Sequence, residues 1–147
     1  MGSKIKNTIE ILLIEDNPGD ILLIKDVLNE DNDPFDLKVI KDGGEAMDYL
    51  GSLSRNQQNG LPDLVILDLN LPKKNGREIL ASIRAVENLK DLSVIIFTSS
   101  DAEEDIAICR NLNVVSYYKK PIDYDEYVIT VRAIKNSIKE IIALSGN

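Results

Sequence analysis

Short runs of consecutive apolar residues recur along the chain, at residues 11–14, 65–67 and 94–97. Strands that are covered by helices on both faces show this pattern, because neither face of such a strand meets water. We therefore expect these runs to be central strands of a parallel sheet. Residues 35–40 and 114–118 are more mixed in polarity and predict two further strands, nearer the edges of the sheet.

Segments of helical length separate the predicted strands. Asn17 offers an N-cap side chain, and Pro18 follows at the first helical position. Ser100 and Glu103 have the spacing of a capping box, which predicts the start of another helix. The polar stretch at residues 52–60 indicates a loop or an extension of the preceding helix. The remaining helical positions are filled by residues 44–50, 76–86 and 124–144.

Strands and helices thus alternate along the whole chain. This order favours right-handed crossovers and an α/β fold with an open, doubly wound sheet, whose ligands bind beyond the carboxyl ends of the strands. The 147 residues suit one domain. We expect that domain to span residues 9–144, with a loose N-terminus at 1–8 and a short tail at 145–147.

Composition narrows the possible functions. The net charge of −8 argues against nucleic acid or an anionic membrane as the main partner, since both are polyanions. No apolar run approaches the roughly 18 residues of a membrane span, and the N-terminus has no signal-peptide core, so we expect a cytoplasmic protein. The absence of histidine excludes Ser-His and Cys-His catalysis and a phosphohistidine donor. The single cysteine, Cys109, is expected on the apolar side of a helix.

Acidic residues follow two of the predicted strands. Glu15 and Asp16 come directly after the first strand and Asp68 after the third, so these acids should meet at one edge of the sheet. Their mutual repulsion favours a bound cation, and Mg²⁺ prefers such hard oxygen ligands. Thr98 and Lys120 end the fourth and fifth strands, which completes a set suited to phosphoryl transfer with Asp68 as nucleophile. The alternative is that the acids are merely solvated turn residues.

The chain resembles the receiver domain of two-component response regulators over about residues 10–144. The resemblance rests on four motifs in the expected order, at residues 13–17, 65–72 followed by Gly76, 97–99 and 117–121. It implies a flavodoxin-like (βα)5 fold with a five-stranded parallel sheet in the order 2-1-3-4-5. It also implies a phosphorylation switch rather than an enzyme, with at most a slow autophosphatase activity.

The resemblance assigns roles at the acidic edge. Asp68 would accept a phosphoryl group from a phosphohistidine of a sensor histidine kinase. Asp16 and Asp68 would bind Mg²⁺ directly, Glu15 would act through water, and the backbone carbonyl of Asn70 would be a further ligand. Ser99 and Asn70 border the path of hydrolytic water in such domains, so the lifetime of the phosphorylated state stays open.

The resemblance also assigns the residues that would contact the phosphoryl group and respond to it. Lys120 would pair with the acceptor carboxylate and then with the phosphoryl group, aimed inward by a cis peptide bond at Pro121. Thr98 would bind the phosphate, and Tyr117 would turn into the space that Thr98 leaves. An ordinary strand tyrosine remains the alternative for Tyr117. Lys119 could also reach the site, although the position before proline favours Lys120.

Pro72 and Gly76 are expected to shape the turn after Asp68 rather than to contact a ligand. The polar stretch at 52–60 and the absence of an output domain resemble stand-alone receivers associated with phytochrome-type kinases. Apolar residues recur at helical spacing in the last helix, which predicts either packing on the sheet or, with the fifth strand, a homodimer. These residues are Tyr127, Val131, Ile134, Ile138 and Ile141.

Other functions are alternatives to the role of phosphoacceptor. A phosphate-independent pseudo-receiver that acts as a protein-binding module would have the same fold. A phosphohydrolase of the haloacid-dehalogenase type is disfavoured, because Asn70 and Pro72 stand where its motif requires an acid and a threonine. A flavodoxin-like cofactor protein would need a glycine-rich phosphate loop after the first strand. The acidic stretch 31–33 lacks the glycine and glutamate of an EF-hand and is expected to be a turn.

Overall fold

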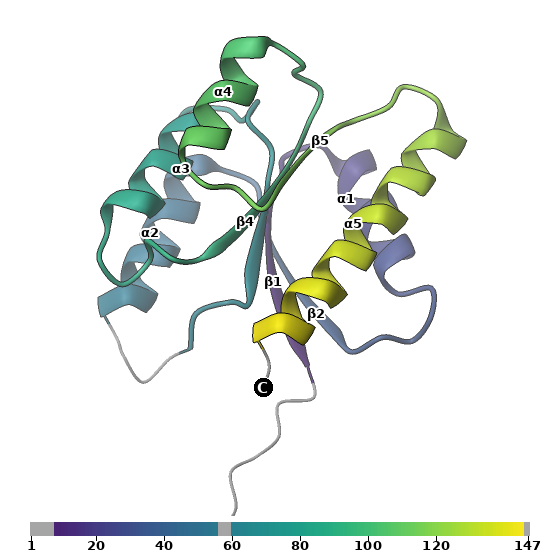
Figure 1. Ribbon diagram of the computed structural model, residues 1–147, viewed down its shortest axis with the longest axis horizontal. Helices are drawn as coiled ribbons and strands as arrows, with labels where there is room; N and C mark the ends of the chain where they lie inside the picture. The colour runs from purple at the N-terminus through teal and green to yellow at the C-terminus, as the bar shows by residue number, and fades with distance from the viewer. Residues whose placement is uncertain (1–7, 56–59, 146–147) are drawn as a thin grey trace, which may run out of the picture.

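The structure is a computed structural model that describes residues 8–55 and 60–145. Its described part alternates strictly between strands and helices, as Figure 1 shows. The elements are β1 (Ile9–Ile14), α1 (Pro18–Leu28), β2 (Phe35–Ile40), α2 (Gly43–Arg55), β3 (Leu64–Leu67), α3 (Gly76–Ala85), β4 (Ser93–Thr98), α4 (Glu103–Asn111), β5 (Ser116–Lys119) and α5 (Tyr124–Ser145).

The five strands form one sheet in the order β2-β1-β3-β4-β5, and all four pairings are parallel. This confirms the predicted fold class and strand order. Ile14 pairs with Ile40 on one side and with Leu67 on the other, and Leu67 pairs with Ile96. Because the strands end nearly level with one another, the residues that follow them reach the same edge.

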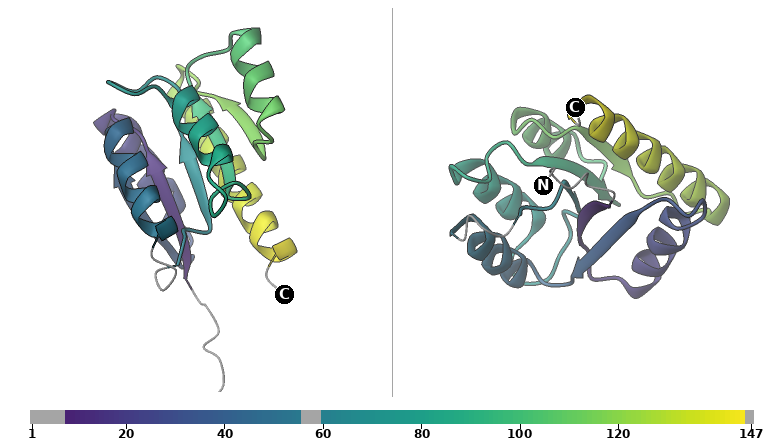
Figure 2. Two further views of the ribbon diagram at one scale, coloured as in Figure 1. Left: turned by 90° about the vertical axis from the view of Figure 1, so that its left-hand side faces the viewer. Right: turned by 90° about the horizontal axis from the view of Figure 1, so that it is seen from below.

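Helices cover both faces of the sheet, which explains the continuous apolar runs (Figures 1 and 2). Alternate strand residues point to opposite faces. Ile11 and Leu13 pack in the cluster that contains α1 and α5, whereas Leu12 and Ile14 pack in the cluster that contains α2, α3 and α4. A strand with two covered faces therefore needs no polar positions.

The helix boundaries agree with the predictions at α1 and differ at α4. Asn17 caps α1 by accepting a hydrogen bond from the backbone of Asp20. Helix α4 begins at Glu103 with Ala102 as an N-cap that makes no side-chain hydrogen bond, so the capping box predicted at Ser100 was wrong. The Ser100 hydroxyl is used elsewhere, because it donates to Asp105 at 2.5 Å.

The remaining expectations for the fold have mixed outcomes. Residues 52–55 extend α2, while residues 56–59 and the N-terminal residues 1–7 lie outside the described part of the chain. Cys109 is fully buried on α4. Tyr127, Val131, Ile134 and Ile138 of α5 are buried against the sheet and Ile141 is partly buried, as the packing interpretation predicted. Among the described residues, no helix is both long enough and apolar enough to cross a bilayer.

Candidate functional site

The three acids that follow β1 and β3 meet at the carboxyl edge of the sheet. Glu15, Asp16 and Asp68 each offer a carboxylate oxygen within 4.8 Å of the others. The backbone N–H of Asp68 donates to the carbonyl of Ile14 at 3.1 Å, which brings the two strand ends together. Glu15 and Asp68 are buried and Asp16 is exposed. Three hard oxygen ligands with one open side are a suitable set for a divalent cation that keeps part of its water shell.

The ammonium of Lys120 lies among these carboxylates. Its backbone N–H donates to the carbonyl of Thr98 at 2.7 Å, which continues the pairing of β4 and β5. Its Nζ donates to Glu15 at 2.7 Å, to Asp20 at 2.8 Å and to Asp68 at 2.9 Å. The side chain of Lys120 is 11% exposed. A buried positive charge therefore offsets part of the negative charge of the edge.

Lys119 points away from this site and pairs with Asp101 at the surface, at 2.9 Å. The structure thus brings Lys120, and not Lys119, to the acids. The predicted cis peptide bond at Pro121 was wrong, because no peptide bond in residues 8–55 and 60–145 is cis. The backbone bond to Thr98 already fixes where Lys120 leaves the sheet, and its long side chain reaches the acids with a trans bond after it.

Burial and neighbouring charges shift the ionisation of this cluster. Burial raises the pKa of Glu15 to about 7, and the charge of Asp68 adds to this effect, while the hydrogen bond and charge of Lys120 oppose it. Burial alone would lower the pKa of Lys120, but its hydrogen bonds with Asp20 and Glu15 raise the pKa overall. Lys120 is consequently charged at neutral pH.

Asn70 and Thr98 lie beside the acceptor carboxylate. The backbone N–H of Asn70 donates to Asp68 Oδ1 at 3.0 Å. The Asn70 amide donates to Ser99 Oγ at 3.2 Å and lies 3.5 Å from Thr98 Oγ1. Thr98 is fully buried at the end of β4. The acidic edge is therefore flanked by the Thr98 hydroxyl and by the side-chain amide and backbone N–H of Asn70.

Tyr117 is joined to the loop between β4 and α4. Its hydroxyl donates to the carbonyl of Ser100 at 2.7 Å, and its side chain is partly buried. The Ser100 hydroxyl donates to Asp105, which also accepts two hydrogen bonds from the Arg77 guanidinium. A chain of contacts therefore runs from α3 through α4 to the residue that lies two positions after Thr98. The switch role of Tyr117 stays a prediction.

Gly76 is required by the close approach of α3 to Asp68. A Cβ atom on Gly76 would lie 2.4 Å from the carbonyl oxygen of Asp68 and 2.6 Å from Leu69 Cα. The intervening turn contains Pro72 and passes through Lys73, whose φ is 65°. These residues set the path of the backbone, and none of the described hydrogen bonds places their side chains at the acids.

Sequence reasoning missed two residues of the site, Asp20 and Tyr127. Asp20 lies in the first turn of α1 and accepts from Lys120, and the Tyr127 hydroxyl donates to Asp20 at 2.6 Å. In the sequence Asp20 looked like an ordinary acid at a helix start and Tyr127 like an apolar packing residue. The one available signal was that Asp20 stands four residues after Asp16, in the first turn of the helix that begins at Pro18.

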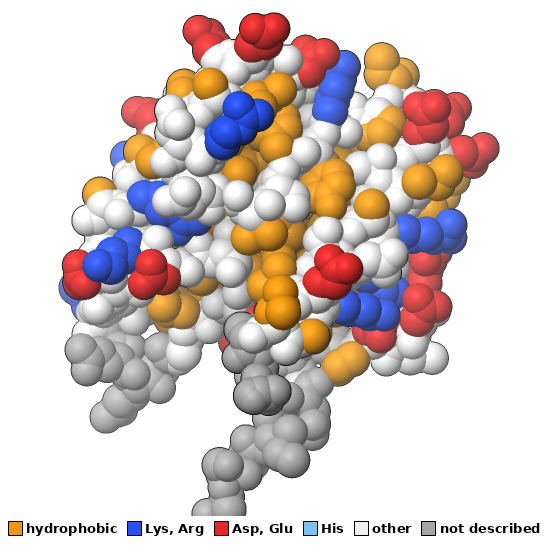
Figure 3. Space-filling view, in the orientation of Figure 1, with side chains coloured by type: hydrophobic (Ala, Val, Ile, Leu, Met, Phe, Trp, Pro, Cys, Tyr) orange, Lys and Arg blue, Asp and Glu red, His pale blue; other side chains and the backbone are white. Residues whose placement is uncertain are grey.

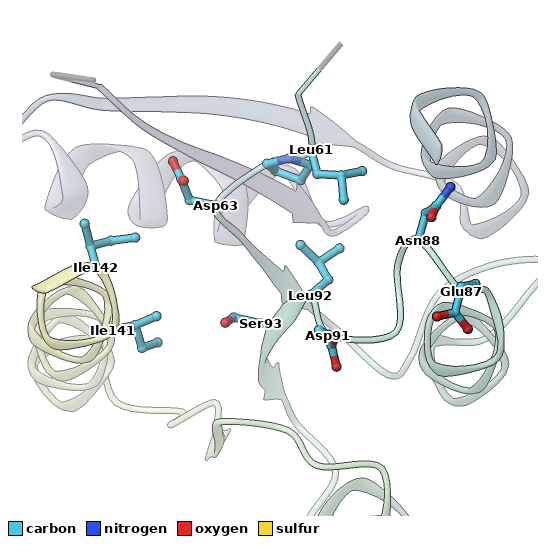
Figure 4. Close-up of a pocket in the computed structure, with 10 residues that line it drawn as sticks. Leu61, Asp63, Glu87, Asn88, Asp91, Leu92, Ser93, Ile141 and Ile142 are labelled. Atoms are coloured by element: carbon cyan, nitrogen blue, oxygen red, sulfur yellow. The ribbon is translucent and has the colours of Figure 1, made fainter. Parts of the chain in front are cut away.

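A concave region lies at the opposite end of the sheet (Figure 4). This cleft of about 320 Å³ is lined by residues of α5, of the loop after α3, of the segment before β3 and of the start of β4. Asp63 is engaged there by the backbone N–H of Glu10 at 2.7 Å. The cleft contains no residue of the acidic edge, so the candidate site is the carboxyl edge.

Comparison with known proteins agrees with this geometry. The family described as "Response regulator receiver domain" matches residues 11–132. The chain belongs to this family. Members of the family act as phosphoacceptor switches in two-component systems, are phosphorylated by sensor histidine kinases and bind a divalent metal. The pseudo-receiver alternative has no support from these matches.

The relatives with solved structures include response regulators, and some of these, such as RcpA, are named for phytochromes. Response regulator Rcp1 of Synechocystis sp. is 34% identical over 134 residues, which are 91% of each chain. The crystal structure of Mn²⁺-bound Rcp1 has a TM-score of 0.80 and 35% identity, and covers 86% of this chain and 91% of that one. The phosphorylated cyanobacterial phytochrome response regulator RcpA has a TM-score of 0.80 and 37% identity, and covers 88% and 92%.

Proposed function

We propose that this receiver domain accepts a phosphoryl group on Asp68 and thereby switches a protein-binding surface. The observation that carries the proposal is the convergence of groups on one buried carboxylate. Asp68 is 5% exposed, Lys120 contacts one of its oxygens, and the backbone of Asn70 contacts the other. Such preorganised donors stabilise the charge of a phosphoryl group in transfer.

The transfer step is a displacement at phosphorus. A carboxylate oxygen of Asp68 forms the new bond to phosphorus, and the bond from phosphorus to the donor, a phosphohistidine nitrogen or the carboxyl oxygen of acetyl phosphate, breaks. The donor atom leaves with the electron pair. Lys120 and Thr98 bind the oxygens of the phosphoryl group, and the Asn70 N–H orients the acceptor.

The proposed metal is Mg²⁺, held directly by Asp16 and Asp68, through water by Glu15, and by the carbonyl of Asn70. The spacing of the three carboxylates supports a divalent cation, because their oxygens lie within 4.8 Å of one another. When bound, Mg²⁺ would neutralise charge on the transferring phosphoryl group. Lys120 supplies a further positive charge beside Asp68.

The switch is proposed to run from Thr98 to Tyr117. Added charge at Asp68 draws the Thr98 hydroxyl towards the phosphate, and the Tyr117 ring moves into the space beside it. The support is structural proximity, because the Tyr117 hydroxyl is bonded to the carbonyl of Ser100, two residues after Thr98. A displacement of Thr98 would therefore occur two residues from the carbonyl group that binds the Tyr117 hydroxyl.

The proposed donor is a sensor histidine kinase in the cytoplasm, of the phytochrome type by similarity to the phytochrome response regulator RcpA. A homodimer through β5 and α5 is proposed as well. Its support is the band of hydrophobic side chains between α4 and α5, where β5 lies (Figure 3). Val115, just before β5, is 45% exposed, and Ile108 on α4 is 40% exposed.

The test is incubation with acetyl phosphate and Mg²⁺, followed by intact mass and by light scattering after size-exclusion chromatography. The native chain should gain the mass of one phosphoryl group, and Asp68→Asn should not. Asp48→Asn, on an exposed position of α2, is the matched control and should label like the native chain. A native chain that stays unlabelled while a known receiver is labelled would refute the phosphoacceptor role. A monomer at all concentrations, labelled or not, would refute the dimer.

A further inference from the structure

Asp20 is a fourth carboxylate at the edge, outside the group of three that could hold a metal. Its Oδ2 accepts from Lys120 Nζ at 2.8 Å, and the other oxygen accepts from the Tyr127 hydroxyl at 2.6 Å. Its backbone N–H donates to the Asn17 cap at 3.0 Å. Asp20 is therefore held at three points, and its side chain is only 18% exposed.

Tyr127 is a rigid partner for Asp20. It lies in the first turn of α5, is 5% exposed, and its ring packs edge-on against Phe97 with centroids 5.3 Å apart. The Phe97 ring also lies beneath the Lys120 ammonium, with Nζ 5.9 Å from the ring centroid. A packed ring that cannot move far fixes the position of its hydroxyl, and with it the carboxylate of Asp20.

We propose that Asp20 and Tyr127 are positioning residues that hold the Lys120 ammonium beside Asp68 during phosphoryl transfer. The proposal rests on the proposed function. It assigns roles to two residues that the resemblance to receiver domains left without one. Tyr127 acts on Asp20, and Asp20 acts on Lys120.

The arrangement of acceptors around Lys120 supports this role. An ammonium has three N–H donors, and all three are used, by Glu15, Asp20 and Asp68. Glu15 and Asp68 belong to the set of acids that could hold a cation, whereas Asp20 does not. When a cation and a phosphoryl group engage the other two acids, Asp20 is the partner that keeps Lys120 in place.

A purely structural role is the competing explanation, since the same hydrogen bonds join α1 to α5. The chain offers a matched control for it. Tyr118 also uses its hydroxyl in a hydrogen bond to α5, with Ser137 Oγ at 2.7 Å, and it is partly buried in the same core cluster. Tyr118→Phe removes a comparable hydrogen bond on the same face without touching Asp20 or Lys120.

The experiment compares the rate of acyl-phosphate formation at fixed acetyl phosphate and saturating Mg²⁺. Loss of one hydrogen bond to a charged group should slow Tyr127→Phe about fivefold, and Asp20→Asn should be slowed about tenfold or more. Tyr118→Phe should stay within about twofold of the native rate. Tyr127→Phe should bind Mg²⁺ like the native chain in calorimetry, because it removes no charge.

Two further measurements separate positioning from stability. In the Asp20→Asn background, Tyr127→Phe should cause no additional slowing, because it acts through Asp20. In protein labelled with ¹⁵N-lysine, the Lys120 ammonium signal, assigned by its loss in Lys120→Arg, should be sharp in the native chain and in Tyr118→Phe. It should broaden in Tyr127→Phe, because the ammonium is then less ordered.

Equal rates for Tyr127→Phe and Tyr118→Phe would overturn the proposal while leaving the phosphoacceptor role intact. Multiplicative slowing in the double variant would overturn it too, since the two residues would then act independently. A native chain that takes up no phosphate would refute both proposals. Circular dichroism verifies the fold of each variant, and the comparison of the two tyrosine variants decides the matter even if Asp20→Asn does not fold.

Discussion

Two arginine–carboxylate pairs of the same bidentate type allow a direct test of what burial does to an ion pair. Arg77 donates through Nε and Nη2 to the two oxygens of Asp105, and Arg132 does the same to Glu30. The side chains of the first pair are 32% and 6% exposed, and those of the second are 54% and 34% exposed. Arg77→Met and Arg132→Met are therefore matched substitutions in different surroundings.

The expected cost of Arg77→Met follows from what it leaves behind. Asp105 would keep the Ser100 hydroxyl as a partner but would lose both guanidinium hydrogen bonds. Breaking a fully buried pair costs about 3–5 kcal/mol, and an exposed pair contributes about 0–1 kcal/mol. Because Arg77 is one-third exposed, water can replace part of its contribution, so we expect a loss of about 2 kcal/mol. The melting temperature should fall by about 5–8 °C.

The assay is urea unfolding followed by circular dichroism, with the free energy of unfolding taken from the midpoint and slope. Arg77→Met should lower the midpoint at an unchanged slope, because the surface exposed on unfolding is nearly the same. Arg132→Met should have a clearly smaller effect, since solvent screens an exposed pair. Equal losses in the two variants would show that burial of Asp105 does not set the strength of its pair.

Two other predictions concern the turn after Asp68 and the ionisation of Asp105. Gly76→Ala should lower the urea midpoint strongly, because its Cβ would lie 2.4 Å from the Asp68 carbonyl oxygen. Gly60→Ala is the control and should leave the midpoint unchanged, because a Cβ there has no atom within 4 Å. Similar midpoints for the two variants would contradict this prediction. The hydrogen bonds from Arg77 and then Ser100 lower the pKa of Asp105 from 3.8 to about 2. Its ionised form therefore stabilises the fold above pH 4, and this contribution is lost as the pH falls towards 2. The difference in unfolding free energy between the native chain and Asp105→Asn should shrink over that range, and a constant difference would refute the assignment.

The sheet and most of the site were predictable because both depend on local patterns. A strand buried on both faces must be apolar throughout, so residues 11–14, 65–67 and 94–97 could be assigned without knowing their partners. In a parallel sheet the residue after each strand then has a known place. This is why the sequence alone predicted that Glu15, Asp68 and Thr98 lie at the same edge of the sheet.

The contacts that were missed join residues far apart in sequence. Tyr127 and Asp20 are 107 positions apart, and their hydrogen bond depends on how α5 packs beside α1. No local pattern records that packing. Ser100 shows the opposite error, because its spacing to Glu103 fitted a capping box, but a buried carboxylate on the following helix takes its hydroxyl instead. A capping preference is overridden where a nearby buried carboxylate offers the hydroxyl a stronger partner.

The contacts of Thr98 and Ser100 bear on how a charge at Asp68 could change the surface of the domain. The carbonyl of Thr98 accepts from Lys120, and its hydroxyl lies near Asn70 beside the acceptor. Two positions later, the Ser100 carbonyl accepts from Tyr117 and its hydroxyl donates to Asp105. A movement of Thr98 towards a phosphoryl group would therefore displace the loop at Ser100, which is bonded to β5 and to α4. The hydrogen bonds of Ser100 that stabilise the loop between β4 and α4 are therefore the same bonds through which the proposed switch must act.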